Sequence, residues 1–281
     1  MINTLKARLK TLLAKTIWSY DAGAFLKYLR KIGVQPGATL MVHSSWQHYN
    51  GFKGKPSELV DALKRAVGEQ GLLVMTSMPY HNMSSAEWLA KGKPMNVRRS
   101  PSMMGLVSEV FRRSKGVDRS ISATHPLLAW GRDAAAFIAD HDKTAKPFGP
   151  DSPFGKLIER DAVILGYDAP FSTFTFTHFV EDHLANTLPV PLYEPEPILG
   201  KVIDHAGNES EQWVSVLSVA ANRLRREHRL VARLEQEGSL QRGKIGNTAL
   251  VWIRASALLA GATKLAQDGT HFFDQPSPNN Q

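Results

Sequence analysis

Short apolar runs of strand length alternate with stretches of helical periodicity along most of this chain. Three runs have the composition of buried strands: residues 39–43 (TLMVH), 71–77 (GLLVMTS) and 162–166 (AVILG). A helical pattern follows the first run at residues 56–67 and opens with Pro-Ser, residue types that favour a helix start. Because strands separated by helices pack in layers, the alternation predicts an α/β fold with a mostly parallel central sheet flanked by helices.

The remaining periodicity predicts further elements of the same fold. We expect strands at residues 127–130 and 247–254, a β-hairpin at 198–204 and 211–216, and helices at 102–113, 133–140, 175–186, 216–237 and 256–267. Nothing in the chain resembles a linker, and 281 residues suffice to bury a core without disulfides. We therefore expect one domain at residues 1–273, followed by a flexible polar tail at residues 274–281.

The composition restricts the chemistry and the partners of the chain. It contains no cysteine, which excludes disulfides, thiolate metal ligands and a cysteine acyl-enzyme, and which fits a cytoplasmic protein. With 34 Lys and Arg against 26 Asp and Glu, the formal net charge is +8. A basic protein attracts anions such as nucleic acid, lipid head groups or an anionic cofactor. The surplus of lysine and arginine can equally lie on a solvated surface without a ligand, so charge alone leaves both interpretations open.

The first 18 residues form a basic amphipathic pattern, with Leu5, Leu9, Leu12 and Leu13 spaced along one helical face. The pattern lacks the cleavage site of a secretory signal, and no stretch of the chain approaches the roughly 18 apolar residues that span a membrane. We therefore expect no stable membrane insertion. A helix packed on the domain is favoured over a helix that lies on a membrane surface.

Thr175, His178 and Glu181 recur at intervals of three, which places them on one face of a helix. A glutamate there can hydrogen-bond one imidazole nitrogen and leave the other as a general base. The alternative is a surface salt bridge, but the apolar neighbours of these residues indicate a partly buried helix and favour a functional role. The spacing does not fit a zinc motif because His183 lies one residue too far along the chain, so no metal is expected.

Three other segments carry residues suited to ligand binding. The loop that begins with Ser44 and Ser45 and contains two glycines offers hydroxyls and backbone amides that suit phosphates, or is an ordinary loop. It matches neither nucleotide-binding glycine motif. His125 precedes a proline at the head of an apolar run, and it either lines a pocket or ends a strand. Ser152 is a predicted helix cap that serves a ligand only if its turn faces the same cleft.

Taken in order, these segments resemble the aminoglycoside 3-N-acetyltransferase family, also called the antibiotic N-acetyltransferase family. The resemblance rests on the motifs LMVHSS, VGEQGLLVMTS, PSMMGLVSEVFRR, RSISATHP, FGPDSPFGKL, AVILG, TFTHFVE and GKIGNTALVWIRA. It spans nearly the whole chain from Leu40 to the last predicted helix. It implies an antibiotic N-acetyltransferase-like fold and an acetyl-CoA-dependent acetyltransferase.

The resemblance also implies roles for individual residues. It assigns His178 as general base, Glu181 as its orienting partner and Thr175 as their neighbour, and it places His125 in the same cleft. The residues that we assign to acetyl-CoA lie in two loops: His43, Ser44, Ser45 and Ser152. Because the chain lacks cysteine, we expect acetyl to pass directly from acetyl-CoA to the acceptor amine, and the alternative is an acyl intermediate on a serine or threonine.

The segment at residues 79–100 departs from the family pattern. The resistance enzymes typically carry many acidic residues there, whereas this chain has Glu87 as its only acid, beside two lysines and the pair Arg98 and Arg99. A polycationic drug would be repelled by such a surface. We therefore predict an anionic acceptor, such as a nucleotide- or phosphate-linked amino sugar, bound by Arg98 and Arg99. The alternative for these arginines is contact with CoA phosphates or with solvent.

Two other functions stay open. The chain can be a true aminoglycoside 3-N-acetyltransferase that confers resistance, or a non-catalytic binder of anions or nucleic acid on the same fold. It contains no nucleic-acid-binding motif, so the expected partners are CoA and a small-molecule amine rather than nucleic acid. The sequence leaves open whether the protein forms a homodimer.

Overall fold

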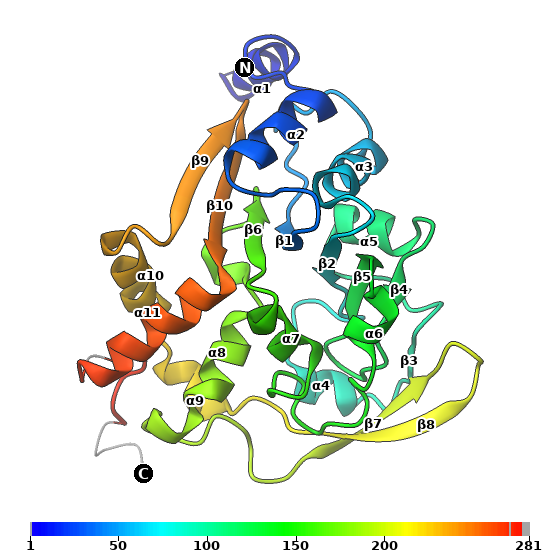
Figure 1. Ribbon diagram of the computed structural model, residues 1–281, viewed down its shortest axis with the longest axis vertical. Coiled ribbons are helices and arrows are strands. Elements are labelled where there is room, and N and C mark those ends of the chain that lie inside the picture. The colour runs from blue at the N-terminus through cyan, green and yellow to red at the C-terminus, as the bar shows by residue number, and fades with distance from the viewer. Residues whose placement is uncertain (1, 270, 277–281) are drawn as a thin grey trace.

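The centre of the molecule is a seven-stranded mixed sheet (Figure 1). The computed structural model describes residues 2–269 and 271–276, without the side chains of residues 2–5. Across the sheet the strands are, in order, β4 (Asp118–Arg119), β5 (Leu127–Gly131), β2 (Leu72–Thr76), β1 (Thr39–Ser44), β6 (Val163–Tyr167), β10 (Thr248–Arg254) and β9 (Gln241–Ile245). The predicted α/β class is confirmed.

Neighbouring strands are parallel only at the centre of this sheet, where β1 pairs with β2 and with β6. The strands on either side, β5 with β4 and β10 with β9, run antiparallel. The prediction of a mostly parallel sheet therefore holds for the centre alone. Apolar runs did not distinguish the two cases, because a strand that is buried on both faces has the same composition with either kind of neighbour.

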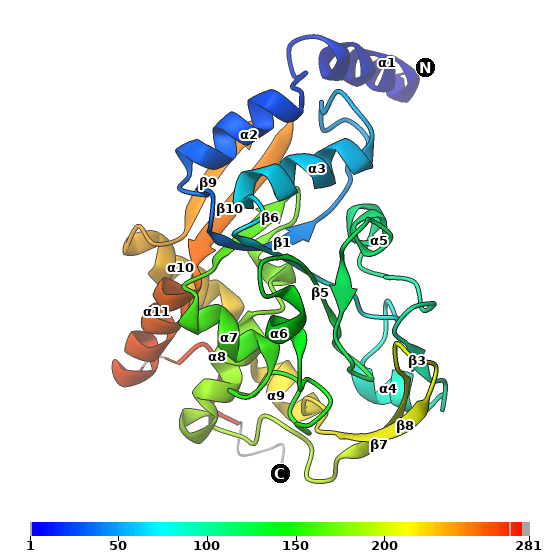
Figure 2. The same cartoon turned by 45° about the vertical axis from the view of Figure 1, so that its right-hand side comes forward.

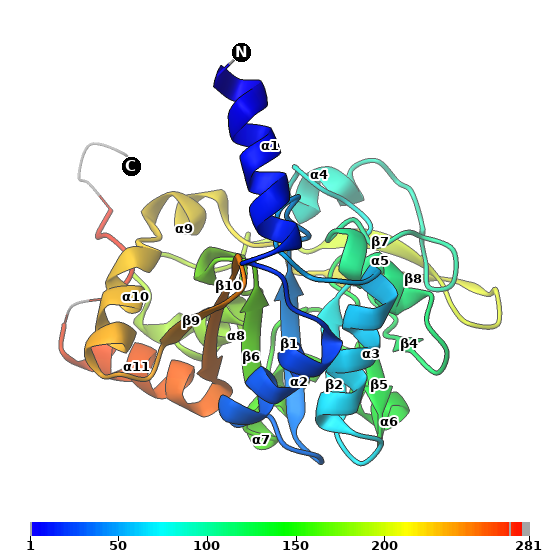
Figure 3. The ribbon, with the colours of Figure 1, turned by 90° about the horizontal axis from the view of Figure 1, so that it is seen from above.

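Helices cover both faces of the sheet and enclose two separate cores (Figures 1 and 3). Three helices cover one face: α2 (Ala22–Lys31), α3 (Pro56–Val67) and α5 (Leu106–Arg112). The other face is covered by α6 (Ala134–Ile138), α7 (Pro153–Glu159), α8 (Thr177–His183), α9 (Val219–Leu224), α10 (Glu227–Gln236) and α11 (Ala255–Gln267). Side chains of a strand alternate between faces, so Leu40 and Val42 of β1 enter the first core and Met41 enters the second.

A smaller three-stranded sheet lies at one edge of the molecule (Figure 2). It joins β3 (Met95–Asn96) to the hairpin of β7 (Ile198–Ile203) and β8 (Glu209–Val214), which confirms the predicted hairpin. Together with the short helix α4 (Ser85–Leu89), it encloses a third core. The polar segment after β2 therefore has secondary structure of its own.

The predicted helix at residues 216–237 is wrong as a single element, because the chain leaves helical geometry at Arg225 and Arg226. It forms α9 (Val219–Leu224) and then α10. The N–H of Arg226 donates instead to the carbonyl of Phe272 at 2.7 Å, and Asp274 N–H donates to Leu224 at 2.8 Å. Hydrogen bonds to the end of the chain therefore replace those of a continuous helix at this point.

Helix α1 (Ile2–Lys15) projects from the molecule instead of packing on it (Figure 3). Leu9 and Leu12, which belong to its apolar face, are 55% and 59% exposed. The predicted packing of this helix on the domain is therefore wrong. In the described part of the chain, no helix combines the length and the apolar character that crossing a membrane requires.

Candidate active site

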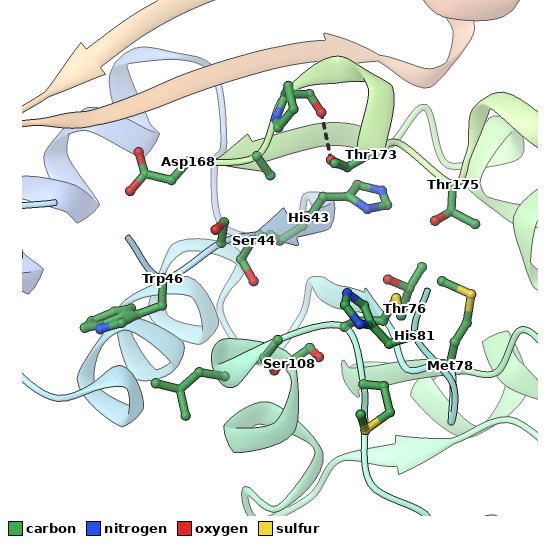
Figure 4. A pocket seen from close by; sticks show the side chains of 18 of the residues that line it. His43, Ser44, Trp46, Thr76, Met78, His81, Ser108, Asp168, Thr173 and Thr175 are labelled. Atoms are coloured by element: carbon green, nitrogen blue, oxygen red, sulfur yellow. Dashed lines mark hydrogen bonds between the residues drawn. The ribbon is translucent and has the colours of Figure 1, made fainter. Parts of the chain in front are cut away.

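A cavity of about 720 Å³, here called the strand-end cavity, opens where β1, β2 and β6 end (Figure 4). Ligands of α/β sheets bind at this edge, because the loops that follow parallel strands meet there. Four of the residues singled out in the sequence line it: His43, Ser44, Ser45 and Thr175. Its volume suits a ligand of cofactor size.

His43, the second-last residue of β1, is a buried polar side chain in the wall of the strand-end cavity. Its ring stacks on Phe174 with centroids 5.1 Å apart. Burial lowers the pKa of His43 to about 3, so the imidazole is neutral at physiological pH. Within the described residues, its Nε2 atom has no hydrogen-bond partner. A buried polar atom of this kind is costly unless a ligand satisfies it, so His43 is suited to hydrogen-bond a molecule in the cavity.

Only the first residues of the loop after β1 reach the strand-end cavity. The N–H of Ser45 donates to the carbonyl of Tyr167 at 2.9 Å, which holds the loop against the end of β6. Gly51 and Gly54, further along the same loop, do not line the cavity. The prediction of an anion-binding loop therefore concerns Ser44 and Ser45, and the two glycines, which have positive φ, lie outside the site.

A second cavity of about 360 Å³, here called the adjoining cleft, lies next to the strand-end cavity. The two share a wall of three residues, Met78, His81 and Met104, which line both. His178 and Arg225 line the adjoining cleft but not the strand-end cavity. Ligands in the two cavities would therefore lie next to each other.

His125 also lines the adjoining cleft. Both of its ring nitrogens have partners: Nε2 lies 3.1 Å from the Tyr80 hydroxyl and Nδ1 lies 2.9 Å from the Thr124 hydroxyl. Burial lowers the pKa of His125 well below its usual value, and the neighbouring His178 lowers it further. His125 is therefore a neutral side chain held in place by two hydroxyls, and it lines the cleft with both of its ring nitrogens already hydrogen-bonded.

His178 and Glu181 form a hydrogen-bonded pair on α8. Nδ1 of His178 lies 2.9 Å from Oε2 of Glu181, which leaves Nε2 of the imidazole free of the carboxylate. The Glu181 side chain is 1% exposed and that of His178 is 24% exposed, so the carboxylate lies behind the imidazole. Burial alone would raise the pKa of Glu181, but the charges and hydrogen bonds of His178 and Arg225 outweigh it and lower the pKa. Glu181 is therefore ionised and can orient the imidazole.

Arg225, in the break between α9 and α10, is the residue of this site that the sequence analysis missed. Its Nε and Nη2 atoms donate to the two carboxylate oxygens of Glu181 at 2.5 and 2.7 Å. The two residues lie 44 positions apart, so no local spacing predicts their contact. The only signal in the sequence was a run of arginines near this position.

Thr175 and His178 connect the two cavities. Thr175 precedes α8 and lines the strand-end cavity, where Figure 4 shows it near His43, whereas His178 lines the adjoining cleft. The N–H of His178 donates to the Thr175 carbonyl at 3.1 Å. The predicted helix at residues 175–186 begins only at Thr177, so Thr175 is outside the helix and serves the other cavity.

Three further predicted residues lie away from both cavities. Ser152 is fully buried and caps α7, where its hydroxyl accepts a hydrogen bond from the Phe154 N–H at 3.2 Å. Arg98 and Arg99 are exposed in the turn after β3, and their N–H groups donate to the Asn96 side chain at 3.0 and 2.8 Å. The structure therefore does not bring these three residues to a ligand cavity.

The fold and the two cavities together define a class of protein. One ligand site lies at the ends of the parallel strands. A second site shares a wall with it and is lined by His178, which is hydrogen-bonded to Glu181. This arrangement suits an α/β enzyme that transfers a group between two substrates, because both reactants can meet beside a proton acceptor.

The chain belongs to the aminoglycoside 3-N-acetyltransferase family, whose sequence profile matches residues 41–267. Membership confirms the resemblance that the sequence motifs carry. It also confirms the expected class of enzyme, an acetyltransferase.

Individual relatives differ in how much of their length is matched. The SPbeta prophage-derived aminoglycoside N(3')-acetyltransferase-like protein YokD of Bacillus subtilis is 26% identical over 188 residues, 62% of this chain and 69% of that protein. Aminoglycoside N(3)-acetyltransferase IV of Salmonella sp is 33% identical over 150 residues, 50% of this chain and 52% of that protein. The solved structure of AAC-IIIb, a binary complex with CoASH, is 24% identical and has a TM-score of 0.73 over 92% of this chain and 99% of that chain. This likeness confirms the fold.

Proposed function

We propose that this protein is an acetyl-CoA-dependent N-acetyltransferase in which His178 acts as the general base. The observation that carries the proposal is the position of the segment from Thr175 to His178, at the start of α8, between two cavities. Thr175 lines one cavity, His178 lines the other, and three residues form the wall that the cavities share. A thioester in the strand-end cavity and an amine in the adjoining cleft would meet beside the imidazole.

The strand-end cavity is the proposed site of acetyl-CoA. That a relative of the same fold was solved with CoASH supports CoA as a ligand of this fold. His43 offers a buried nitrogen without a partner, and Ser44 and Ser45 offer hydroxyls at the end of β1. The Thr175 hydroxyl lies at the same cavity and is suited to donate to the oxygen that becomes negative when an amine attacks the thioester.

The chemistry follows from the His178–Glu181 pair. The nitrogen of an attacking amine must lose a proton, and Nε2 of His178 is the free nitrogen that accepts it. Glu181 accepts the hydrogen bond from Nδ1, which fixes the tautomer and stabilises the imidazolium that forms. The new C–N bond forms as the C–S bond breaks, and the imidazolium returns its proton to the departing thiolate. Since the chain has no cysteine, no thiol of its own can carry the acetyl group.

The proposed acceptor is an amine that also carries a negative charge. The described residues that line the adjoining cleft include Arg225 and no aspartate or glutamate, so a polycation finds no carboxylate there. Arg98 and Arg99, which the sequence suggested as the anion-binding residues, line neither cavity. The competing acceptor is an aminoglycoside, which the names of the relatives favour.

The role of His178 is tested by His178→Ala, assayed with acetyl-CoA and an amine acceptor. We expect kcat to fall by about 10²- to 10⁴-fold, the usual contribution of a positioned general base. The dissociation constant of acetyl-CoA, measured by calorimetry, should change by less than about twofold, because His178 does not line the strand-end cavity.

His183→Ala is the matched control, because His183 is exposed on the same helix and lines neither cavity. Its kcat should equal that of the wild type. If His178→Ala keeps its turnover and loses acetyl-CoA binding, the base assignment is wrong. If the wild-type protein acetylates no amine at all, the proposed function is wrong.

A further inference from the structure

Arg225 is the only side chain with a fixed charge among the described residues that line the adjoining cleft. The other polar members of the lining are histidines, a tyrosine, asparagines and serines. The Arg225 side chain is 20% exposed, while that of its partner Glu181 is 1% exposed. The guanidinium therefore stands between a buried carboxylate and the space that an acceptor would occupy.

The guanidinium keeps hydrogen-bonding capacity on its outer edge. Arginine has five N–H bonds, and the structure uses three of them. Two go to Glu181, and one goes from Nη1 to the Asn222 side-chain oxygen at 2.6 Å. One N–H on each of the two terminal nitrogens thus has no partner within the described residues, and two such N–H groups match two oxygens of one anionic group.

We propose that Arg225 and Asn222 form an anion subsite of the adjoining cleft, which binds a phosphate or carboxylate group of the acceptor while the amine reaches His178. This proposal rests on the proposed function and names the class of acceptor more closely. The Asn222 oxygen accepts from Arg225, so its NH₂ group is free to donate to the same anion. His81 and Asn82 lie in the loop that lines the same cleft and add further donors.

Glu181 does not cancel this preference for an anion. Its carboxylate compensates the charge of Arg225, but both of its oxygens accept hydrogen bonds from Arg225 or His178, and Glu181 is buried and does not line the cleft. An acceptor therefore meets N–H donors and no outward carboxylate. A polycationic acceptor would leave those donors unpaired and would add a positive charge beside them.

The test compares amino sugars that share the same 2-amino group and carry different anionic substituents. Glucosamine, glucosamine 6-phosphate and muramic acid offer the same amine with no anion, a phosphate or a carboxylate, and gentamicin serves as the polycation. We expect wild-type kcat/KM for at least one anionic acceptor to exceed that for glucosamine and for gentamicin by about tenfold or more. Comparison of glucosamine 6-phosphate with muramic acid shows whether the subsite prefers a phosphate or a carboxylate.

Arg225→Gln removes the positive charge and the paired N–H donors of the guanidinium. Arg223→Gln is its matched control. Arg223 is exposed on the neighbouring helix α9 and lines neither cavity. In Arg225→Gln we expect kcat to fall for all acceptors alike, because Glu181 keeps only its contact with His178, and the kcat/KM advantage of the anionic acceptor to fall to about twofold or less. Arg223→Gln should keep the wild-type ratio. Arg225→Lys, which keeps the charge without the paired N–H donors, should be intermediate and serves if Arg225→Gln fails to fold.

Binding without turnover separates this proposal from the proposed function. Calorimetry with glucosamine 6-phosphate should show binding by the wild type and by Arg223→Gln, and at least about tenfold weaker binding by Arg225→Gln. If binding follows this pattern but no amine is acetylated, the subsite stands and the proposed function falls. If amines are acetylated and neither the ratio nor the binding depends on Arg225, the anion subsite is wrong. Preference for gentamicin over both anionic acceptors also overturns it.

Discussion

Glu109 on α5 is a carboxylate on which four hydrogen bonds converge. It accepts from the N–H of Ser102 at 2.7 Å and from the guanidinium groups of Arg112 and Arg113 at 2.6 to 2.8 Å. The hydrogen bond from Arg112 is the largest influence, and it lowers the pKa of Glu109 from 4.5 to about 2 in spite of partial burial. A carboxyl whose pKa is lower in the folded chain stabilises the fold above the unfolded pKa and loses that contribution as the pH falls.

We therefore expect Glu109→Gln to lower the free energy of unfolding at pH 7 by about 1 kcal/mol, allowing for solvent screening of the pair. The difference from the wild type should shrink as the pH falls from 4.5 toward about 2, where the wild-type carboxyl itself becomes protonated. Urea unfolding at a series of pH values measures both effects. Glu159→Gln, at an exposed position, should show neither. A difference that stays constant over this range would rule out the ionised form of Glu109 as the cause.

The candidate site shows which residue roles a sequence can disclose. The contact between His178 and Glu181 was predictable because the two residues are one helical turn apart, and the structure places them 2.9 Å apart. The contact with Arg225 was not, because it depends on where a distant segment leaves its helix. Ser152 has the residue type and spacing of a helix cap, and that local role accounts for its contacts completely.

The break between α9 and α10 is the element that places Arg225. Leu224, Arg225 and Arg226 meet the chain end through backbone hydrogen bonds and an isolated bridge from Arg225 to Phe273. Asp274 adds ion pairs to Arg226 at 2.5 Å and to Arg229 at 2.6 Å. Asp274 is the first residue of the tail that the sequence analysis predicts to be flexible, and residues 277–281 of that tail lie outside the described residues.

We expect Asp274→Asn to destabilise this junction and with it the position of Arg225. Loss of two partly exposed ion pairs should cost about 1 kcal/mol, which corresponds to a fall in melting temperature of about 2–4 °C. The KM for the acceptor should rise while the affinity for acetyl-CoA stays unchanged. Asp268→Asn is the matched control, because it removes an exposed ion pair to Arg233 at 2.7 Å and leaves the junction intact. An equal rise in KM in both variants would contradict the role of the junction.

Elements with a clear apolar pattern were predictable and elements without one were not. The predicted helix at residues 56–67 has the bounds of α3, because six of its residues are buried at helical spacing. Strand β9 was missed, because none of its five residues is buried and it is held as an edge strand by β10. Helix α2 was missed as well, because only Phe25 and Leu29 of its ten residues are buried.

At the scale of the whole molecule, α1 stands apart from the three cores. The cores contain no described residue of this helix, and Leu9 and Leu12 remain exposed. Removal of residues 2–15 should therefore change the melting temperature by less than about 2 °C and leave acetyltransferase activity unchanged. Differential scanning fluorimetry and the acetyl-transfer assay measure both. The truncation must keep Trp18, whose ring lies 5.9 Å from Nζ of Lys244. A large loss of stability would show that α1 packs against another surface in solution.

The Glu181 carboxylate accepts hydrogen bonds from both His178 and Arg225, and this constrains any redesign of the protein. An engineer who exchanges Arg225 for an acid, to admit a polyamine drug, would set two carboxylates against each other beside the proton acceptor. Exchange for a neutral residue would leave a buried anion with a single partner. A successful redesign, or a natural drift toward other acceptors, must therefore alter positions 181 and 225 together or bring in a replacement cation from a third position.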